Sequence, residues 1–169
     1  NAHFNLGNAL LKSGDAEDAV EHFQRALQGE PDFAEAHYSL GTALLQQGRE
    51  SDALTQFQQA VQLKPDYSEA LNDLAWELAT APLPSVRDGN KAVEFAQRAD
   101  RLTGSNDLDI LDTVAAAYAE AHRFEDAVRT AQQAIAFARS SGQESRVAQL
   151  TSELALYETG QPFHREGKK

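Results

Sequence analysis

Residues 3–31, HFNLGNALLKSGDAEDAVEHFQRALQGEP, return in altered form as residues 37–65, HYSLGTALLQQGRESDALTQFQQAVQLKP. Every matching position lies 34 residues from its counterpart. The matched pairs are Leu6 and Leu40, Gly7 and Gly41, Leu10 and Leu44, Ala19 and Ala53, Phe23 and Phe57, Ala26 and Ala60, and Pro31 and Pro65. Self-similarity at such a period indicates a repeat protein, in which neighbouring units stack to bury a continuous core.

Each repeated unit has the pattern of two amphipathic helices joined by a short turn at Gly14 or Gly48. Pro31 or Pro65 separates one unit from the next, because proline cannot continue a helix. We expect Gly7 and Ala19 to let the two helices of a unit approach closely, and Phe23 to fill the space between units. One unit cannot bury its apolar face alone, so the units must stack.

The same spacing continues downstream in weaker form. First-helix positions are Leu71, Leu74, Ala75 and Leu78 in a third unit and Leu111, Val114, Ala115 and Tyr118 in a fourth. Second-helix positions are Ala92, Ala96 and Ala99 in the third unit and Ala127, Ala131 and Ala134 in the fourth. After Gly142, the stretch QESRVAQLTSELALYE has helical periodicity without a partner helix, which predicts a capping helix with a more polar outer face.

Residues 79–90, ATAPLPSVRDGN, interrupt the helical pattern with two prolines and a glycine. They could link two domains or interrupt a single repeat. From Leu78 to Ala92 is a step of fourteen residues, whereas the equivalent step in the other units, such as Leu10 to Ala19, is nine. This favours a five-residue insertion between the two helices of one repeat, with Asp88 capping the second helix.

These positions resemble the tetratricopeptide repeat (TPR) family, with His3 and His37 in place of the family's signature tryptophan. Residues 74–104 and 111–128 also resemble a bacterial type with an extended loop inside the third repeat, and its usual ending fits Tyr157, Gly160, Pro162 and Phe163. The resemblance implies an all-α fold: a right-handed TPR superhelix of four helix-turn-helix repeats plus a C-terminal capping helix.

The expected organisation is a single solenoid domain over residues 1–163. Its repeats are 1–33, 34–67, 68–106 and 107–142, followed by a capping helix at 143–159 and a flexible tail at 164–169. The chain opens directly on a repeat helix with no preceding cap, so we expect further repeats or another domain upstream.

In the TPR family the first helix of each repeat lines a concave groove that binds peptides or partner helices. Carried over by position, the resemblance implies a peptide-binding groove lined by Phe4, Asn5, Asn8, Lys12, Glu35, Tyr38, Thr42, Glu69, Asn72, Asp73, Trp76, Asp109 and Asp112. The same helix faces carry Asn1, Ser39, Gln46, Thr113 and Glu120.

Acidic side chains outnumber basic ones in this groove, where Lys12 is the one lysine. The clamp with which some TPR domains hold chaperone carboxylates needs basic residues where Phe4, Glu69 and Asp73 stand, so an acidic ligand is disfavoured. A basic or neutral segment fits better, with Phe4, Tyr38 and Trp76 as aromatic anchors. Two alternatives stay open: that the acids serve only solubility, and that Trp76 packs against the inserted loop instead.

No catalytic motif, phosphate-binding loop or two-ligand metal spacing occurs in the sequence. His3 and His37 occupy packing positions, so we expect neither a metal nor a cofactor, and no enzymatic activity. The formal net charge of −11 argues against nucleic-acid binding, and no apolar run is long enough for direct membrane insertion. The chain has no cysteine, and nothing in it identifies a compartment.

The sequence therefore predicts a protein–protein interaction module, a scaffold or adaptor whose acidic, aromatic-lined groove takes a peptide or partner helix. Two alternatives remain. One is a C-terminal regulatory or substrate-recruiting module of a larger bacterial enzyme or membrane-anchored protein. The other is a scaffold that forms homo-oligomers through an uncapped N-terminal face.

Overall fold

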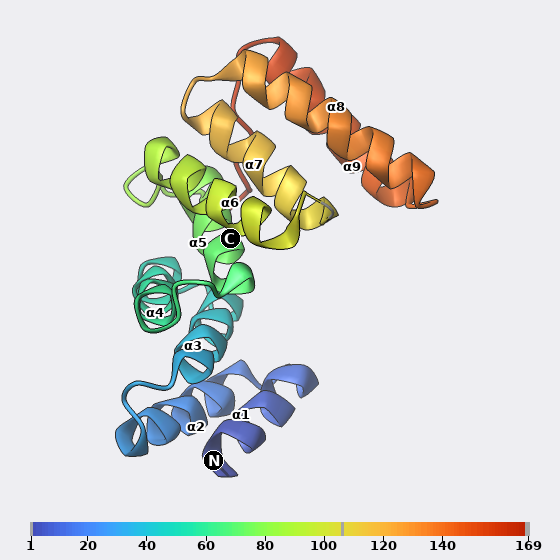
Figure 1. The fold of residues 1–169 in the computed structure, drawn as a ribbon. Coiled ribbons are helices and arrows are strands. Elements are labelled where there is room, and N and C mark those ends of the chain that lie inside the picture. Colours follow the sequence, from blue (N-terminus) through green and yellow to red (C-terminus); the bar gives the residue numbers. More distant parts are fainter. Residues whose placement is uncertain (1, 106, 168–169) are drawn as a thin grey trace. The chain divides into compact units, whose positions relative to one another are not determined.

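Helices are the regular elements of the computed structural model, which describes residues 2–105 and 107–167 (Figure 1). Their bounds are α1 (Ala2–Ser13), α2 (Ala16–Gly29), α3 (Ala34–Gln46), α4 (Glu50–Leu63), α5 (Ser68–Thr80), α6 (Gly89–Thr103), α7 (Leu108–Glu120), α8 (Phe124–Ser140) and α9 (Glu144–Glu158). The prediction of an all-α fold is confirmed. The helices belong to two compact units, Asn1–Ala70 and Leu71–Lys169.

In the first unit α1 packs on α2, α2 on α3 and α3 on α4. The small residues of the repeat permit this packing. A Cβ atom on Gly7 would lie 2.7 Å from the ring of Phe23, and one on Gly41 would lie 2.6 Å from the ring of Phe57. Both rings are fully buried. Phe23 and Phe57 thus fill the space between the two helices of their own repeats, in addition to any role between repeats.

Aromatic clusters repeat with the same period. Phe4 packs against Phe23 and Phe33, with ring centroids 6.1 and 4.7 Å away. Tyr38 makes the equivalent contacts with Phe57 and Tyr67, at 5.8 and 5.1 Å. The tight turns between paired helices also repeat, because Gly14 and Gly48 both adopt positive φ angles, of 89° and 75°.

The two signature-position histidines lie at helix contacts of the first unit. His3 stacks on His22 with a centroid distance of 5.1 Å. The ring nitrogens of His37 lie 2.8 Å from Gln56 Oε1 and 2.9 Å from the carbonyl oxygen of Pro31. Both rings therefore take part in packing between neighbouring elements.

In the second unit α6 packs on α7, α7 on α8 and α8 on α9. The alanines that marked the third and fourth repeats in the sequence are buried in it, including Ala92, Ala96 and Ala99 of α6. The helix α9 lies where a capping helix was expected, one residue shorter at each end. It buries Leu150 and Tyr157 against α7 and α8.

The connection of residues 81–88 lies inside the second unit, between α5 and α6. Its last residue, Asp88, caps α6 as predicted, because the side chain accepts a hydrogen bond of 3.1 Å from the Lys91 amide. Arg87 fixes the middle of the loop. It donates to the Ala81 carbonyl oxygen at 2.7 Å and to Glu120 Oε1 at 3.0 Å.

The flexible tail expected for residues 164–169 stays a prediction, and the described part of this segment contacts α5 and α7. His164 contacts Glu120, and Arg165 contacts both Glu77 and Thr80. Residues 168 and 169 lie outside the described residues. The structure thus places His164 and Arg165 in contact with helices of the second unit.

Candidate functional site

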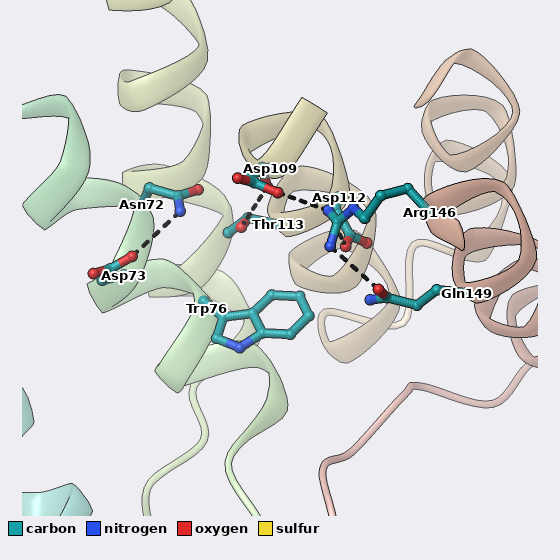
Figure 2. Close-up of a pocket in the computed structure, with 8 residues that line it drawn as sticks. All are labelled: Asn72, Asp73, Trp76, Asp109, Asp112, Thr113, Arg146 and Gln149. Atoms are coloured by element: carbon teal, nitrogen blue, oxygen red, sulfur yellow. Dashed lines mark hydrogen bonds and ion pairs between the residues drawn. The ribbon is translucent and has the colours of Figure 1, made fainter. Parts of the chain in front are cut away.

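A cavity of about 320 Å³ opens in the second unit between α5, α7 and α9 (Figure 2). Its walls combine polar side chains with one aromatic ring. The lining residues are Asn72, Asp73, Trp76, Asp109, Asp112, Thr113, Arg146 and Gln149.

The first wall comes from α5, whose apolar residues Leu71, Leu74 and Ala75 are fully buried and fix the rotation of the helix. This orientation brings Asn72, Asp73 and Trp76 to the cavity at the spacing of one helical turn. The Asn72 side-chain amide donates to Asp73 Oδ1 at 3.4 Å. The half-buried Trp76 ring forms an apolar side below the polar groups (Figure 2).

The second wall comes from the start of α7. The helix begins after Asp107, whose carboxylate accepts hydrogen bonds from the amides of Asp109 and Ile110 at 2.9 and 3.3 Å. Asp109 and Asp112 then follow three residues apart on the cavity side. The Asp109 side chain is 75% exposed, whereas that of Asp112 is only 4% exposed.

The third wall is α9, which supplies the only cation among the lining residues. Arg146 Nη2 donates to Asp109 Oδ1 at 2.7 Å and to Asp112 Oδ2 at 3.2 Å. Its Nη1 donates to Gln149 Oε1 at 3.2 Å. Arg146 therefore joins α9 to α7 across the cavity (Figure 2).

A buried pair of acids lies behind this wall. Asp112 and Glu153 are each 3% exposed, and within the described part of the chain Asp112 Oδ1 and Glu153 Oε2 have no hydrogen-bond donor. Burial, and then the neighbouring Glu153, raise the pKa of Asp112 to about 8, against the opposing charge of Arg146.

The structure brings five of the thirteen predicted groove residues to this cavity, together with Thr113 from the same helix faces. These five are Asn72, Asp73, Trp76, Asp109 and Asp112.

The other eight predicted residues belong to the first unit and do not line this cavity. Phe4 and Tyr38 are members of the repeated aromatic clusters, and Glu35 pairs with Lys64 at 3.0 Å. Thr42 donates to the Tyr38 carbonyl oxygen at 3.1 Å. The remaining four are Asn5, Lys12 and Glu69, which are exposed, and Asn8, which is half-buried. Asn1 lies outside the described residues.

Two lining residues were not predicted, Arg146 and Gln149 of α9. The repeat pattern assigns positions only within helix pairs, and α9 has no partner helix, so the pattern gives no rule for which α9 residues face a groove. The available signal was charge, since Arg146 is the single cation in the first turns of a helix next to the acidic start of α7.

Within residues 2–105 and 107–167, no group of three or more acidic or histidine side chains is arranged to hold a metal ion. None of the helices described is both long and apolar enough to cross a membrane.

Comparison with known families identifies the first part of the chain. The family model for the tetratricopeptide repeat matches residues 4–68. These residues are tetratricopeptide repeats. No curated protein matches the sequence.

Solved structures of MamA share the TPR fold seen here. A MamA RS-1 ArsTM double mutant has a TM-score of 0.70 at 16% identity, with 94% of this chain and 93% of that chain covered. MamA from residue 41 to the end, from Desulfovibrio magneticus RS-1, has a TM-score of 0.70 at 17% identity, with 95% of each chain covered. A further MamA structure gives 0.69 at 19% identity, covering 94% of this chain and 87% of that one. At these identities the likeness concerns the fold alone.

Proposed function

We propose that this chain is a scaffold that binds a basic or neutral segment of a partner protein at the cavity of the second unit. The coarse function follows from the fold, since TPR repeats present binding surfaces for other proteins and are generally not enzymes. The observation that supports the finer proposal is the cavity itself. Trp76 and three aspartates, from two different helices, surround one space.

The charge of the lining favours a basic or neutral partner. Asp73 and Asp109 supply two carboxylates against the single guanidinium of Arg146, whereas burial raises the pKa of Asp112 to about 8. An incoming carboxylate would meet like charges at Asp73 and Asp109, whereas an incoming ammonium or guanidinium group would not. The Trp76 ring adds a surface against which a cation, or the aliphatic part of a Lys or Arg side chain, can pack.

A peptide array of basic, neutral and acidic sequences tests this proposal. We expect binding of basic or neutral peptides and a loss of about tenfold or more in affinity for Trp76→Ala and for Asp73→Lys/Asp109→Lys, because hot-spot truncations and charge reversals have effects of that size. The matched control is Glu94→Lys/Glu125→Lys, which makes the same charge change at exposed positions of the second unit outside the cavity. Equal binding of acidic peptides, or unchanged binding by the aspartate variant, would refute the proposal.

A second candidate, self-association, is favoured by one comparison between repeats. Leu6 on α1 is 47% exposed, whereas its equivalent Leu40 on α3 is 4% exposed. Leu40 is covered because α1 and α2 of the preceding repeat pack on α3. A second copy of the chain could cover Leu6 in the same way.

A further inference from the structure

Residues 159–167, which follow α9, return along the second unit and reach α5 (Figure 1). The chain turns at Gly160, which has a positive φ of 72°, and the Gln161 amide donates back to the Leu156 carbonyl oxygen at 2.9 Å. Residues 161–167 then run without regular structure, with Pro162 and Phe163 half-buried. We call residues 161–167 the C-terminal strap.

An aromatic contact holds the first part of the strap. Phe163 packs against the core cluster around Ala115 and Tyr157, and its ring centroid lies 6.2 Å from that of Trp76. Ring pairs at this separation contribute beyond the area that they bury. Trp76 is therefore shared between the cavity and the strap.

Basic groups and the backbone hold the second part. His164 Nε2 lies 2.6 Å from Glu120 Oε2, and Arg165 Nη2 donates to Glu77 Oε2. The Arg165 amide also donates to the Thr80 carbonyl oxygen at 2.9 Å. An aromatic ring and a guanidinium two residues further on thus meet a tryptophan and a carboxylate on α5.

The surface that contacts the strap carries two acids and is suited to binding a cation. Glu77 is 1% exposed, and a buried carboxylate is costly unless it is paired and hydrogen-bonded, so the contact with Arg165 stabilises its charged form. Glu120 is held in place from the other side by Arg87 of the 81–88 loop, at 3.0 Å, and only 15% of its side chain is exposed. Both acids are positioned by the second unit and face the strap.

We propose that Trp76, Glu77, Thr80 and Glu120 form a recognition surface for an extended segment in which an aromatic residue precedes an arginine by two positions. The resident occupant is the chain's own C-terminal strap, bound in cis. A partner segment of the same chemistry binds there only by displacing the strap. This surface goes beyond the proposed cavity function and does not depend on it, because the two sites share only Trp76.

The test uses the full chain with the strap released by substitution. In Phe163→Ala/Arg165→Ala the surface loses its resident ligand, while α5 and α7 are unchanged. A labelled peptide with the sequence of residues 160–169 is titrated into this variant and into the unaltered chain. We expect at least about tenfold tighter binding to the variant, since a tethered segment competes at an effective concentration in the millimolar range.

Peptide variants identify the groups that are recognised. Peptides with Phe163→Ala or Arg165→Ala are expected to lose most of the affinity, and Glu77→Gln in the released chain should weaken the unaltered peptide. Asp73→Lys/Asp109→Lys in the released chain should leave peptide binding intact, which separates this surface from the cavity. Equal and weak binding of the peptide to both chains would overturn the proposal.

The fluorescence of the only tryptophan gives a second readout that needs no added peptide. If the strap covers Trp76, its quenching by acrylamide should increase in Phe163→Ala/Arg165→Ala and fall again on addition of the unaltered peptide. Circular dichroism reports whether the variant keeps its helices. Identical quenching in a folded variant and in the unaltered chain would also overturn the proposal.

Discussion

At the scale of single residues, the first two repeats depend on a glycine that faces a phenylalanine ring. Gly7 meets Phe23 and Gly41 meets Phe57, at distances that leave no room for a Cβ atom. A fully buried ring has no space into which it can move. The glycine of the repeat signature therefore has a direct steric cause.

Gly41→Ala is expected to lower the free energy of unfolding by about 1–3 kcal/mol, the usual effect of an extra methyl group in a packed core. The matched control is Gly29→Ala at the end of α2, where no atom outside the neighbouring residues and the helix's own backbone lies within 4 Å of the added carbon. That control should change stability by less than about 0.5 kcal/mol. Urea unfolding followed by circular dichroism measures both, and equal values for the two variants would contradict this account.

At the scale of elements, the contact between α7 and α9 contains a buried acid pair beside its apolar residues. Asp112 and Glu153 are both 3% exposed, and Arg146 adds an ion pair at the edge. Burial raises the pKa of Asp112 from its ordinary value of 3.8 to about 8. The folded chain therefore binds this proton over a pH range in which the unfolded chain has already lost it.

The sign of the pH dependence follows from this difference. Between pH 3.8 and about 8 the folded state binds more protons at Asp112 than the unfolded state, so the free energy of unfolding falls as the pH rises through that range. The slope for one such group is at most about 1.4 kcal/mol per pH unit. Asp112→Asn removes the ionisable group, so it should lose less stability between pH 5.5 and pH 8.5 than the unaltered chain.

Asp109→Asn is the control for that experiment, because Asp109 also pairs with Arg146 but has a side chain that is 75% exposed. It should keep the pH dependence of the unaltered chain. Thermal unfolding at a series of pH values measures all three proteins. A slope for Asp112→Asn that equals the unaltered slope would show that the carboxyl group is not the source.

Elements inside the repeat pattern could be predicted from the sequence, and elements outside it could not. The alanine spacing located α6 across an unusual loop, and the cap at Asp88 was correct. The strap follows no such pattern, since Arg165 contacts Glu77 across 88 residues and His164 contacts Glu120 across 44. Contacts at such separation depend on how the helices pack, which a periodic pattern does not encode.

The same reasoning applies to the cavity. Asn72, Asp73 and Trp76 could be named because they occupy groove positions of a repeat helix. Arg146 could not, because α9 has no counterpart in the repeat. The acid pair behind the cavity could not be named either, since the repeat pattern marks Asp112 as a groove position but assigns no position to Glu153 of α9.

At the scale of the whole molecule, the chain consists of two compact units that meet in sequence after Ala70, within α5. The proline-containing stretch, which first suggested a linker, lies instead inside the second unit and is fixed there by Arg87 and Asp88. The first unit carries the repeats that match the family model, and the second carries the cavity and the strap. A single solenoid over residues 1–163 stays a prediction.

Self-association is the remaining prediction at this scale, and Leu6 allows it to be tested. Leu6→Glu should abolish association through α1 or weaken it by about tenfold or more, because a charge would replace a leucine that the contact buries. Leu102→Glu is the matched control, since Leu102 on α6 is exposed to a similar extent, 49% against 47%. Light scattering after size-exclusion chromatography at several concentrations measures the mass. We expect the unaltered chain and Leu102→Glu to gain mass with concentration and Leu6→Glu to remain a monomer. An unaltered chain that stays monomeric throughout would rule out this contact.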